Sequence, residues 1–255
     1  MKVRKPGLLV LTCLYFLSLP VAAESYRFVY ASYPPANYKT PDGKSSGFFC
    51  DILRELIEKR LGSVLVMETY PWARCQVMVR DGSADIMATI PTPERLEYSV
   101  QTSRPFWVKE YLVWTWAGHP RAKEMDSIRS VNDILRDGLT VISYIGNDWS
   151  RITLEDMGVP VINAVSVEGM YQMLSVKRAD ILIEDPFLVY DSVSRKEVLD
   201  RIEATEGILG RSSFHFLVSK KSPLASRIAE LDQALSDMLA DGTIDRILGE
   251  YSGVR

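Results

Sequence analysis

ADIMATIPTPER, residues 84–95, and ADILIED, residues 179–185, carry most of the information on how this chain folds. Each begins as an apolar run of strand length and ends in a charged residue, Arg95 in the first and Asp185 in the second. A guanidinium binds a carboxylate through two parallel charge-assisted hydrogen bonds, and a carboxylate accepts hydrogen bonds from an ammonium. Placed face to face, the two side chains would bind both head groups of a free amino acid.

Strands and helices alternate on the N-terminal side of the first stretch. Residues 26–32 and 64–69 are β-prone, and apolar residues recur at helical spacing from Phe49 to Leu61, with Gly62 as a C-cap. Pro71 begins a second helix that ends at Asp81-Gly82. This alternation predicts an α/β fold in which helices cover a mostly parallel sheet.

A second alternation of strands and helices follows, between two long β-prone runs at residues 106–116 and 214–219. Two such units joined by two runs predict two lobes with two crossing strands as a hinge, near residues 112–117 and 214–220. We expect lobe 1 to comprise residues 24–112 and 218–255, and lobe 2 residues 113–217. Ligands of open α/β sheets bind beyond the carboxyl ends of the strands, so the cleft between the lobes is the expected site.

The first 23 residues differ from the rest of the chain. A basic start (Lys2, Arg4 and Lys5) precedes an apolar run and the small residues Val21-Ala22-Ala23, which is typical of a secretory signal peptide cleaved after Ala23. The alternatives are a membrane anchor, for which the run is too short, and a lipoprotein modified at Cys13, which Thr12 before it does not favour. We therefore expect a periplasmic protein. Hydrophobic residues make up 47% of the chain, enough for a sizeable core, and its net charge of −3 argues against nucleic acid as a partner.

Few residues of the chain suggest redox, metal or cofactor chemistry. Cys50 and Cys75 lie near the starts of consecutive predicted helices, so in an oxidising compartment they would be either a disulfide or two buried free thiols. His119 and His215 lack the spacing of metal ligands, and there is no glycine-rich phosphate loop. We expect no metal and no cofactor.

Four segments, in order, resemble the family 3 bacterial extracellular solute-binding proteins, which are periplasmic binders of polar amino acids. The segments are YPPANYKTPDGKSSGFFCDILREL (residues 33–56), RDGSADIMATIPTPER (80–95), KRADILIEDPFLVY (177–190) and LDQALSDMLADGTIDRILGEY (231–251). They are spread over nearly the whole chain beyond residue 23. The resemblance implies the two-lobed periplasmic-binding-protein fold of type II, a small-molecule ligand, an ABC membrane permease as partner and a monomeric state.

The resemblance also implies roles for individual residues. These are Arg95 for the ligand carboxylate, Asp185 for its ammonium, Tyr33 for its side chain, Trp72 for an aromatic wall, Thr89 for a hydroxyl contact and Asn147 for the helix start of lobe 2. Two features depart from the family pattern. The link between the strand and Arg95 is shorter than usual, and Asp148, next to Asn147, would oppose an anion.

Simpler interpretations stand beside these roles. Arg95 would pair with Glu94 or Glu97 on the surface, Asp185 would cap the helix that begins at Pro186, and Trp72 would be part of the core.

The expected function is capture of an amino acid or similar zwitterion in the cleft, without catalysis, and delivery to the permease. The first alternative is an enzyme, because the same fold resembles periplasmic dehydratases of prephenate-like acids, in which a cleft carboxyl is the general acid. Glu184 and Asp185 adjoin in this region, but neighbouring side chains of a strand point to opposite faces, so only one would enter the cleft. The second alternative is a sensor that docks on a separate receptor.

Overall fold

The computed structural model describes residues 24–192 and 196–251. The predicted signal peptide, residues 1–23, therefore lies outside the described residues. Within the residues that are described, no helix has the length and apolar character needed to cross a membrane.

The strands form one long curled sheet and a small hairpin. The long sheet has the order β4-β1-β5-β11-β7-β10-β8-β9, with β6 also paired to β11, and the hairpin is β2-β3. The pairs β1–β4, β1–β5, β10–β8 and β8–β9 are parallel, so the predicted α/β class is confirmed. The strands are β1 (Ser25–Tyr30), β2 (Tyr38–Lys39), β3 (Ser45–Ser46), β4 (Val64–Thr69), β5 (Ile86–Thr89), β6 (Ser99–Gln101), β7 (Trp107–Trp116), β8 (Val141–Tyr144), β9 (Val161–Ala164), β10 (Ile181–Glu184) and β11 (Ile202–Ser219).

The two helices predicted before residue 84 are found close to their predicted bounds. The apolar repeat from Phe49 to Leu61 forms α1 and continues into the π-helical η1, and α2 ends at Gly82, whose φ of 86° suits glycine. The helices are α1 (Phe48–Arg54), η1 (Glu55–Arg60), α2 (Trp72–Asp81), α3 (Pro93–Tyr98), α4 (Ala122–Met125), α5 (Val131–Arg136), α6 (Asp148–Ser150), η2 (Arg151–Glu155), α7 (Val167–Ser175), α8 (Pro186–Ser192), α9 (Lys196–Leu199), η3 (Pro223–Arg227), α10 (Ile228–Ala240) and α11 (Thr243–Tyr251).

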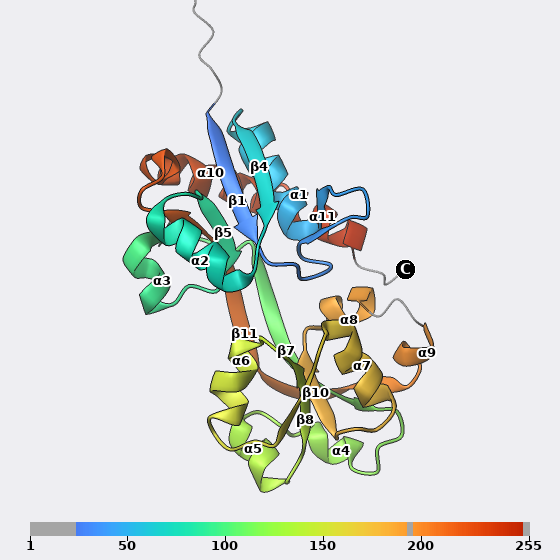
Figure 1. Ribbon diagram of the computed structural model, residues 1–255. Helices are drawn as coiled ribbons and strands as arrows, with labels where there is room; N and C mark the ends of the chain where they lie inside the picture. Colours follow the sequence, from blue (N-terminus) through green and yellow to red (C-terminus); the bar gives the residue numbers. More distant parts are fainter. Residues whose placement is uncertain (1–23, 193–195, 252–255) are drawn as a thin grey trace, which may run out of the picture.

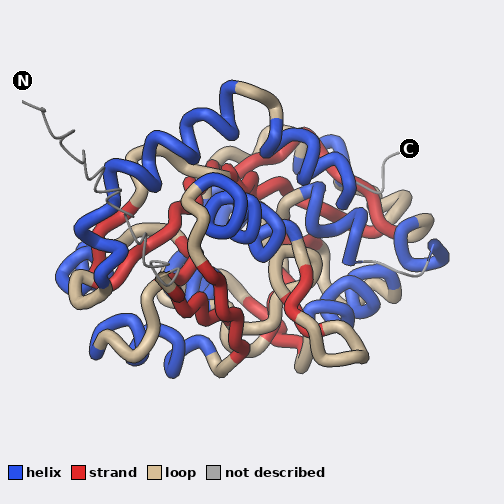
Figure 2. Tube along the Cα trace, turned by 90° about the horizontal axis from the view of Figure 1, so that it is seen from above, coloured by secondary structure: helices blue, strands red, loops and turns tan. Residues whose placement is uncertain are grey.

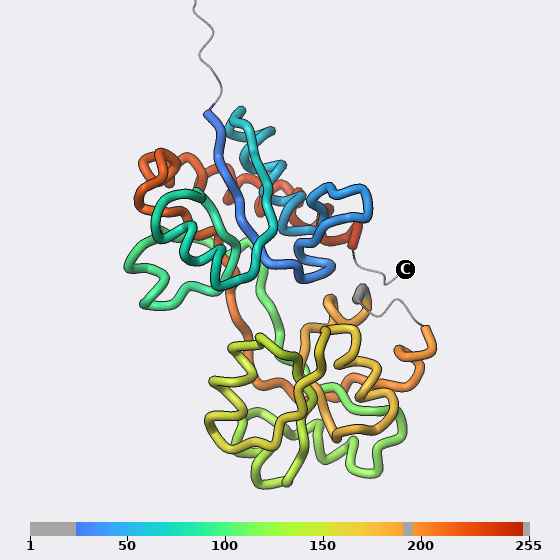
Figure 3. The backbone as a smooth tube through the Cα atoms, viewed as in Figure 1, coloured from blue at the N-terminus to red at the C-terminus, as the bar shows by residue number. Residues whose placement is uncertain are grey.

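The elements gather into two bodies joined by β7 and β11 (Figure 1). We call lobe 1 the body with β1, β4, β5, β6, α1–α3, α10 and α11, and lobe 2 the body with β8–β10 and α4–α9. β7 pairs with β10 from Leu112 onward, and β11 pairs with β5 from His215 onward. The segments that pass between the bodies in Figure 3 therefore include residues 107–111 and 208–214, a few residues before the predicted crossings. The exact lobe boundaries stay a prediction.

Helices surround the sheet in the view from above (Figure 2). In lobe 1, β1 has one face toward α1 and α10 and the other toward α2, because Phe28 and Val29 point to opposite sides. Cys50 packs in the first of these cores and Cys75 in the second, so the sheet separates them. Both are free buried thiols, and the disulfide that the sequence left open is not formed.

Helix α8 contacts both lobes. It follows β10 of lobe 2, yet its Leu188, 1% exposed, is part of the core of lobe 1. Its Phe187 packs edge-on against Phe48 of α1, with ring centroids 5.0 Å apart. Such an aromatic pair contributes about 0.5–1.5 kcal/mol beyond its buried area. The two lobes are thus in contact on one side of the crossing strands.

Candidate ligand site between the lobes

The carboxyl ends of the strands in both lobes bring polar side chains together at the lobe interface. Tyr33 follows β1 and Thr89 ends β5 in lobe 1, while Tyr144 ends β8 and Glu184 ends β10 in lobe 2. Tyr33 is also fixed by two backbone hydrogen bonds with Asn37, of 2.6 and 3.0 Å. This is the position where open α/β sheets bind ligands.

A buried ion pair lies at the centre of this interface. Lys109 of β7 places its Nζ 2.5 Å from Oε1 of Glu184, and their side chains are only 11% and 2% exposed. The Tyr33 hydroxyl donates to Oε2 of Glu184 at 3.0 Å and accepts from Nζ of Lys109 at 3.1 Å. Burial, followed by the charge of Glu184, raises the pKa of Tyr33, which keeps this hydroxyl protonated as a donor. The triangle therefore ties lobe 1, the crossing strand and lobe 2 together.

Two aromatic rings lie near the ammonium of Lys109. Nζ lies 5.4 Å from the ring centroid of Tyr111, within the range of cation–π attraction, whereas its hydrogen bond to the Tyr33 hydroxyl places it at the edge of the Tyr33 ring. Tyr111 in turn stacks on Trp149 of lobe 2, with centroids 4.1 Å apart and planes 5° from parallel. Packing thus fixes the rings around the ion pair.

Asp185 caps helix α8, which is the simpler of the two roles that the sequence suggests for it. Its Oδ1 accepts from the backbone N–H of Phe187 at 2.9 Å, at the start of α8, and its Oδ2 accepts from the backbone N–H of Glu110 at 2.6 Å. The carboxyl is 4% exposed. Burial outweighs these two hydrogen bonds and raises its pKa from 3.8 to about 6. Asp185 joins the start of α8 to the crossing strand, and its role toward a ligand stays a prediction.

Arg95 is held on the other side of the interface, on α3. Its Nε donates to Oε1 of Gln76 at 3.2 Å and its Nη1 to the backbone oxygen of Ile90 at 2.8 Å. The guanidinium lies over the ring of Trp72, 5.4 Å from the centroid. Burial lowers the pKa of Arg95. Tyr98 and Glu94 of the same helix act in the opposite direction, and Asp148 of lobe 2 does so more weakly. An arginine nevertheless stays charged in proteins.

The other two predicted site residues support backbone structure. Thr89 is 7% exposed and pairs with His215 of β11 in the sheet. Asn147 caps α6, accepting from the backbone N–H of Ser150 at 3.2 Å, and donates to Oγ of Ser143. A contact of either Thr89 or Asn147 with a ligand stays a prediction.

The structure thus groups the predicted residues into two clusters rather than one. Tyr33 and Asp185 lie with the Lys109–Glu184 pair, whereas Trp72 lies under Arg95. Among the contacts of the described residues, none joins Arg95 to Asp185 directly.

Sequence reasoning missed Lys109 and Tyr111. The signal was present, because Lys109 and Glu110 are the charged residues of the otherwise apolar run FWVKEYLVWTW. A charged residue in a buried strand requires a partner of opposite sign.

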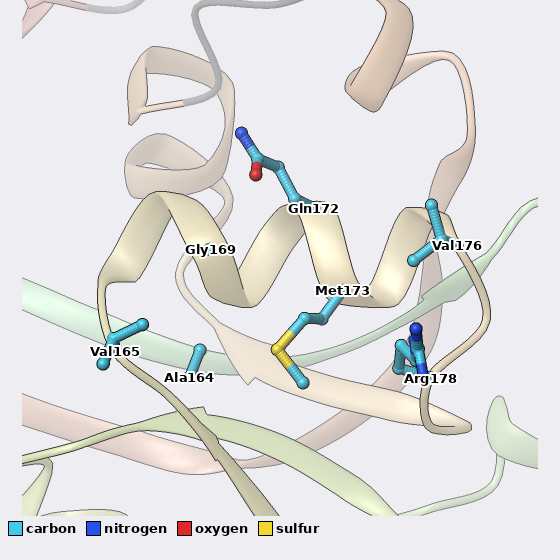
Figure 4. A pocket seen from close by; sticks show the side chains of 7 residues that line it. All are labelled: Ala164, Val165, Gly169, Gln172, Met173, Val176 and Arg178. Atoms are coloured by element: carbon cyan, nitrogen blue, oxygen red, sulfur yellow. The ribbon is translucent and has the colours of Figure 1, made fainter.

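A pocket elsewhere on lobe 2 does not belong to this site. It has a volume of about 430 Å³ and lies between α7 and the end of β9 (Figure 4). Met173 and Ala164 form its floor, and Val165 at its rim is 90% exposed. Arg178 is the ionisable residue of its lining. Elsewhere too, the described residues contain no group of three histidine, cysteine or acidic side chains arranged for a metal ion.

We predict that ionisation of Asp185 lowers the free energy of unfolding as the pH rises. Its folded pKa of about 6 exceeds the unfolded value of 3.8, so between these values the folded state binds more protons. Stability is then greatest below the unfolded pKa and falls by up to about 3 kcal/mol as the pH passes the folded pKa. Urea unfolding at a series of pH values from 4 to 7 measures this loss of stability. Asp185→Asn, whose side-chain oxygen still caps α8, is expected to remove this component, and an equal slope in both proteins would contradict the prediction.

Solved structures share this fold over nearly their whole length. The probable amino-acid ABC transporter extracellular-binding protein from Bacillus subtilis is 20% identical, with a TM-score of 0.70 over 91% of this chain and 99% of that one. An ancestral arginine-binding protein bound to arginine is 23% identical, with a TM-score of 0.66 over 90% and 98%. The GluR0 ligand-binding core with L-glutamate is 18% identical, with a TM-score of 0.70 over 92% and 100%. The predicted two-lobed fold of type II periplasmic binding proteins is therefore confirmed.

A comparison with curated proteins finds no match. The family model of the bacterial extracellular solute-binding proteins, family 3, matches residues 28–254. This range takes in both lobes and every described residue of the interface between them. The chain therefore belongs to the bacterial extracellular solute-binding proteins, family 3.

Proposed function

We propose that this protein binds a small zwitterion, an amino acid or a close analogue, between its lobes in the periplasm and delivers it to an ABC permease. The observation that carries the proposal is that the side chain of Arg95 is held in a fixed orientation. Its guanidinium is oriented by Gln76, Ile90 and the ring of Trp72, and within the described part of the chain no acidic side chain forms an ion pair with it. A cation held in this way is ready to receive a carboxylate.

The carboxylate of the ligand would supply the ion-pair partner that Arg95 lacks among the described residues. Asp148 is exposed, so its attraction to Arg95 is screened by water and contributes little. A ligand carboxylate would instead contact the guanidinium directly, with charge-assisted hydrogen bonds. Asp148 itself pairs with Arg151 at 3.7 Å.

The ammonium of the ligand would bind on the side of Asp185. Both oxygens of Asp185 accept backbone hydrogen bonds, yet each carboxylate oxygen has two lone pairs, so each keeps one for a further donor. The negative charge of Glu184 next to it is already matched by Lys109. Asp185 is therefore the carboxylate whose charge a ligand ammonium would complement.

Contacts from both lobes would link binding to closure. A ligand that touches Arg95 in lobe 1 and Asp185 in lobe 2 is bound best when the lobes are together, so it shifts the population toward the closed form. The closed form is the one that a permease would recognise. The relatives named as ABC transporter binding proteins support this partner.

The enzyme alternative would depend on Asp185. A general acid must present a proton to the substrate. Glu184 is occupied by Lys109, Tyr33 and the backbone N–H of Asp185, whereas Asp185, with a pKa raised to about 6, is expected to be mostly ionised at neutral pH and so suited to bind an ammonium. We therefore propose binding without chemical turnover.

A thermal-shift screen tests the proposal on residues 24–255. Amino acids, organic acids and sugars are compared at equal concentration, and each compound that raises the melting temperature is confirmed by calorimetry. A ligand of the folded state stabilises it by mass action, so an amino acid is expected to give the largest rise. A response to sugars with none to amino acids would contradict the proposal, as would turnover of prephenate.

A further inference from the structure

The ammonium of Lys109 sits among groups that normally recognise a ligand cation. We call Tyr33, Tyr111 and Glu184 the cation cage. Glu184 supplies a carboxylate oxygen 2.5 Å from Nζ, Tyr33 a hydroxyl oxygen at 3.1 Å, and Tyr111 an aromatic ring with its centroid at 5.4 Å. A carboxylate combined with aromatic faces is a standard receptor for organic ammonium ions.

The cation cage is assembled from separate parts of the fold. Tyr33 comes from the loop after β1 in lobe 1, Glu184 from the end of β10 in lobe 2, and Tyr111 from the crossing strand β7. Its occupant is nevertheless the protein's own side chain, 11% exposed, which enters from β7. Lys109 thus holds a position in the interface that the ammonium of a guest molecule would suit.

We propose that Lys109 is a specificity-determining residue, which fills the cation cage with its own ammonium and so excludes from it any ligand group with a positive charge. A second cation there would meet the charge of Nζ at close range, while the one carboxylate of the cage is already neutralised. Ligand groups without a positive charge, whether polar or apolar, meet no such repulsion. The wild-type cleft therefore selects against ligands with a cationic side chain.

Truncation of Lys109 would convert the cation cage into a binding site for an external amine. Lys109→Ala removes three methylene groups and the ammonium, which together have the size and charge of propylammonium. Glu184 and both tyrosine rings remain, and Glu184 then lacks its counter-charge. An amine that enters this space restores the ion pair without the covalent link.

Chemical rescue tests this inference without knowledge of the natural ligand. Melting temperatures of the wild type, Lys109→Ala and the surface control Lys123→Ala are measured with propylammonium chloride, sodium chloride or propan-1-ol. We expect propylammonium to raise the melting temperature of Lys109→Ala by about 2–4 °C above sodium chloride, with no such gain in the other two proteins. Lys109→Ala/Glu184→Gln, which lacks the carboxylate, is expected to lose the gain.

An equal response of all proteins, or a response to propan-1-ol as large as that to propylammonium, would overturn the inference. If Lys109→Ala does not fold, Lys109→Ser takes its place, since serine leaves the same space and bonds water there. If neither variant folds unaided, soluble yield on refolding is compared with and without propylammonium, and an unchanged yield counts against the cage.

The selectivity for amino acids rests on the proposed function and is measured separately by calorimetry. Lys109→Ala is expected to gain at least about tenfold in affinity for arginine or lysine relative to glutamine, a ratio that corresponds to about 1.4 kcal/mol. A ratio unchanged from wild type, together with successful rescue by propylammonium, would restrict the role of Lys109 to the interface and overturn its role in selectivity. Rescue by propylammonium in a protein that binds no amino acid would instead contradict the proposed function alone.

Discussion

Glu184→Ala is expected to lower the free energy of unfolding by about 3–5 kcal/mol, among the largest effects of any single substitution in this chain. The substitution leaves the ammonium of Lys109 in the interface without its partner, with a side chain only 11% exposed. Two further donors lose their acceptor, the hydroxyl of Tyr33 and the backbone N–H of Asp185. An uncompensated buried charge with unsatisfied donors costs far more than the net contribution of the intact pair.

Two variants separate the charge from the hydrogen bonds. Glu184→Gln removes the charge but keeps one amide oxygen, so one of the two donors retains its acceptor, and its loss of stability should be smaller than that of Glu184→Ala. Lys109→Met/Glu184→Gln removes both charges and is expected to recover most of the stability, since a neutral pair leaves no ion unpaired. Together with the single variant Lys109→Met, these proteins form a double-mutant cycle whose coupling gives the interaction energy.

An exposed ion pair of the same protein serves as the matched control. Glu250 pairs with Arg246 at 2.9 Å on α11, where the two side chains are 59% and 60% exposed. Glu250→Ala should cost only about 0.3–0.5 kcal/mol. Urea unfolding followed by circular dichroism measures all five variants. A loss for Glu184→Ala as small as that for Glu250→Ala would show that the pair is not buried in solution.

Features that depend on neighbouring residues could be predicted from the sequence. The apolar spacing from Phe49 to Leu61, the start at Pro71 and the glycine stop at Gly82 are local signals of helices, and each is found. Alternation of such helices with β-prone runs then limits the fold to the α/β class. The fold was therefore accessible without any knowledge of long-range contacts.

The candidate site could be predicted only in part, because its contacts join distant residues. Lys109 and Glu184 are 75 positions apart, and no local pattern indicates which acid a buried lysine will meet. The same holds for Cys50 and Cys75, whose separation depends on which face of β1 each helix covers. Asp185 shows a third difficulty, since a strand-end acid before proline fits both a ligand contact and a helix cap.

Helix α8 illustrates how packing between lobes escapes local rules. Its apolar residues Phe187 and Leu188 suit a helix of lobe 2, yet they pack on lobe 1. Burial of these side chains and the Lys109–Glu184 pair both favour lobes in contact. These contacts within the protein lower the free energy of the closed form relative to the open form. A ligand therefore needs to supply only the rest of the free energy of closure.

Arg95→Ala is expected to weaken binding of the ligand found by the screen by about 10²–10³-fold. Loss of one partner from a hydrogen-bonded charge pair costs about 2–5 kcal/mol, and 1.4 kcal/mol corresponds to a tenfold change in affinity. The effect should be large here because Gln76, Ile90 and Trp72 already orient the guanidinium, so binding a carboxylate loses little side-chain entropy. Isothermal calorimetry on the wild type and the variant measures the change.

Arg80→Ala is the matched control for Arg95→Ala. Arg80 also lies in lobe 1, over the ring of Tyr98 at 4.7 Å and paired with Glu94 at 2.7 Å, but on the surface. It should leave affinity within about twofold, because an exposed pair contributes at most about 1 kcal/mol to stability and has no part in the cleft. Circular dichroism establishes that Arg95→Ala is folded, since the substitution also removes the hydrogen bond to Ile90. If the folded variant binds within threefold of wild type, the carboxylate is bound elsewhere, and the backbone N–H groups of lobe 2 would have to supply the missing charge. That outcome is physically demanding, because the exposed carboxylate of Asp148 lies at the start of α6 and would repel the same anion.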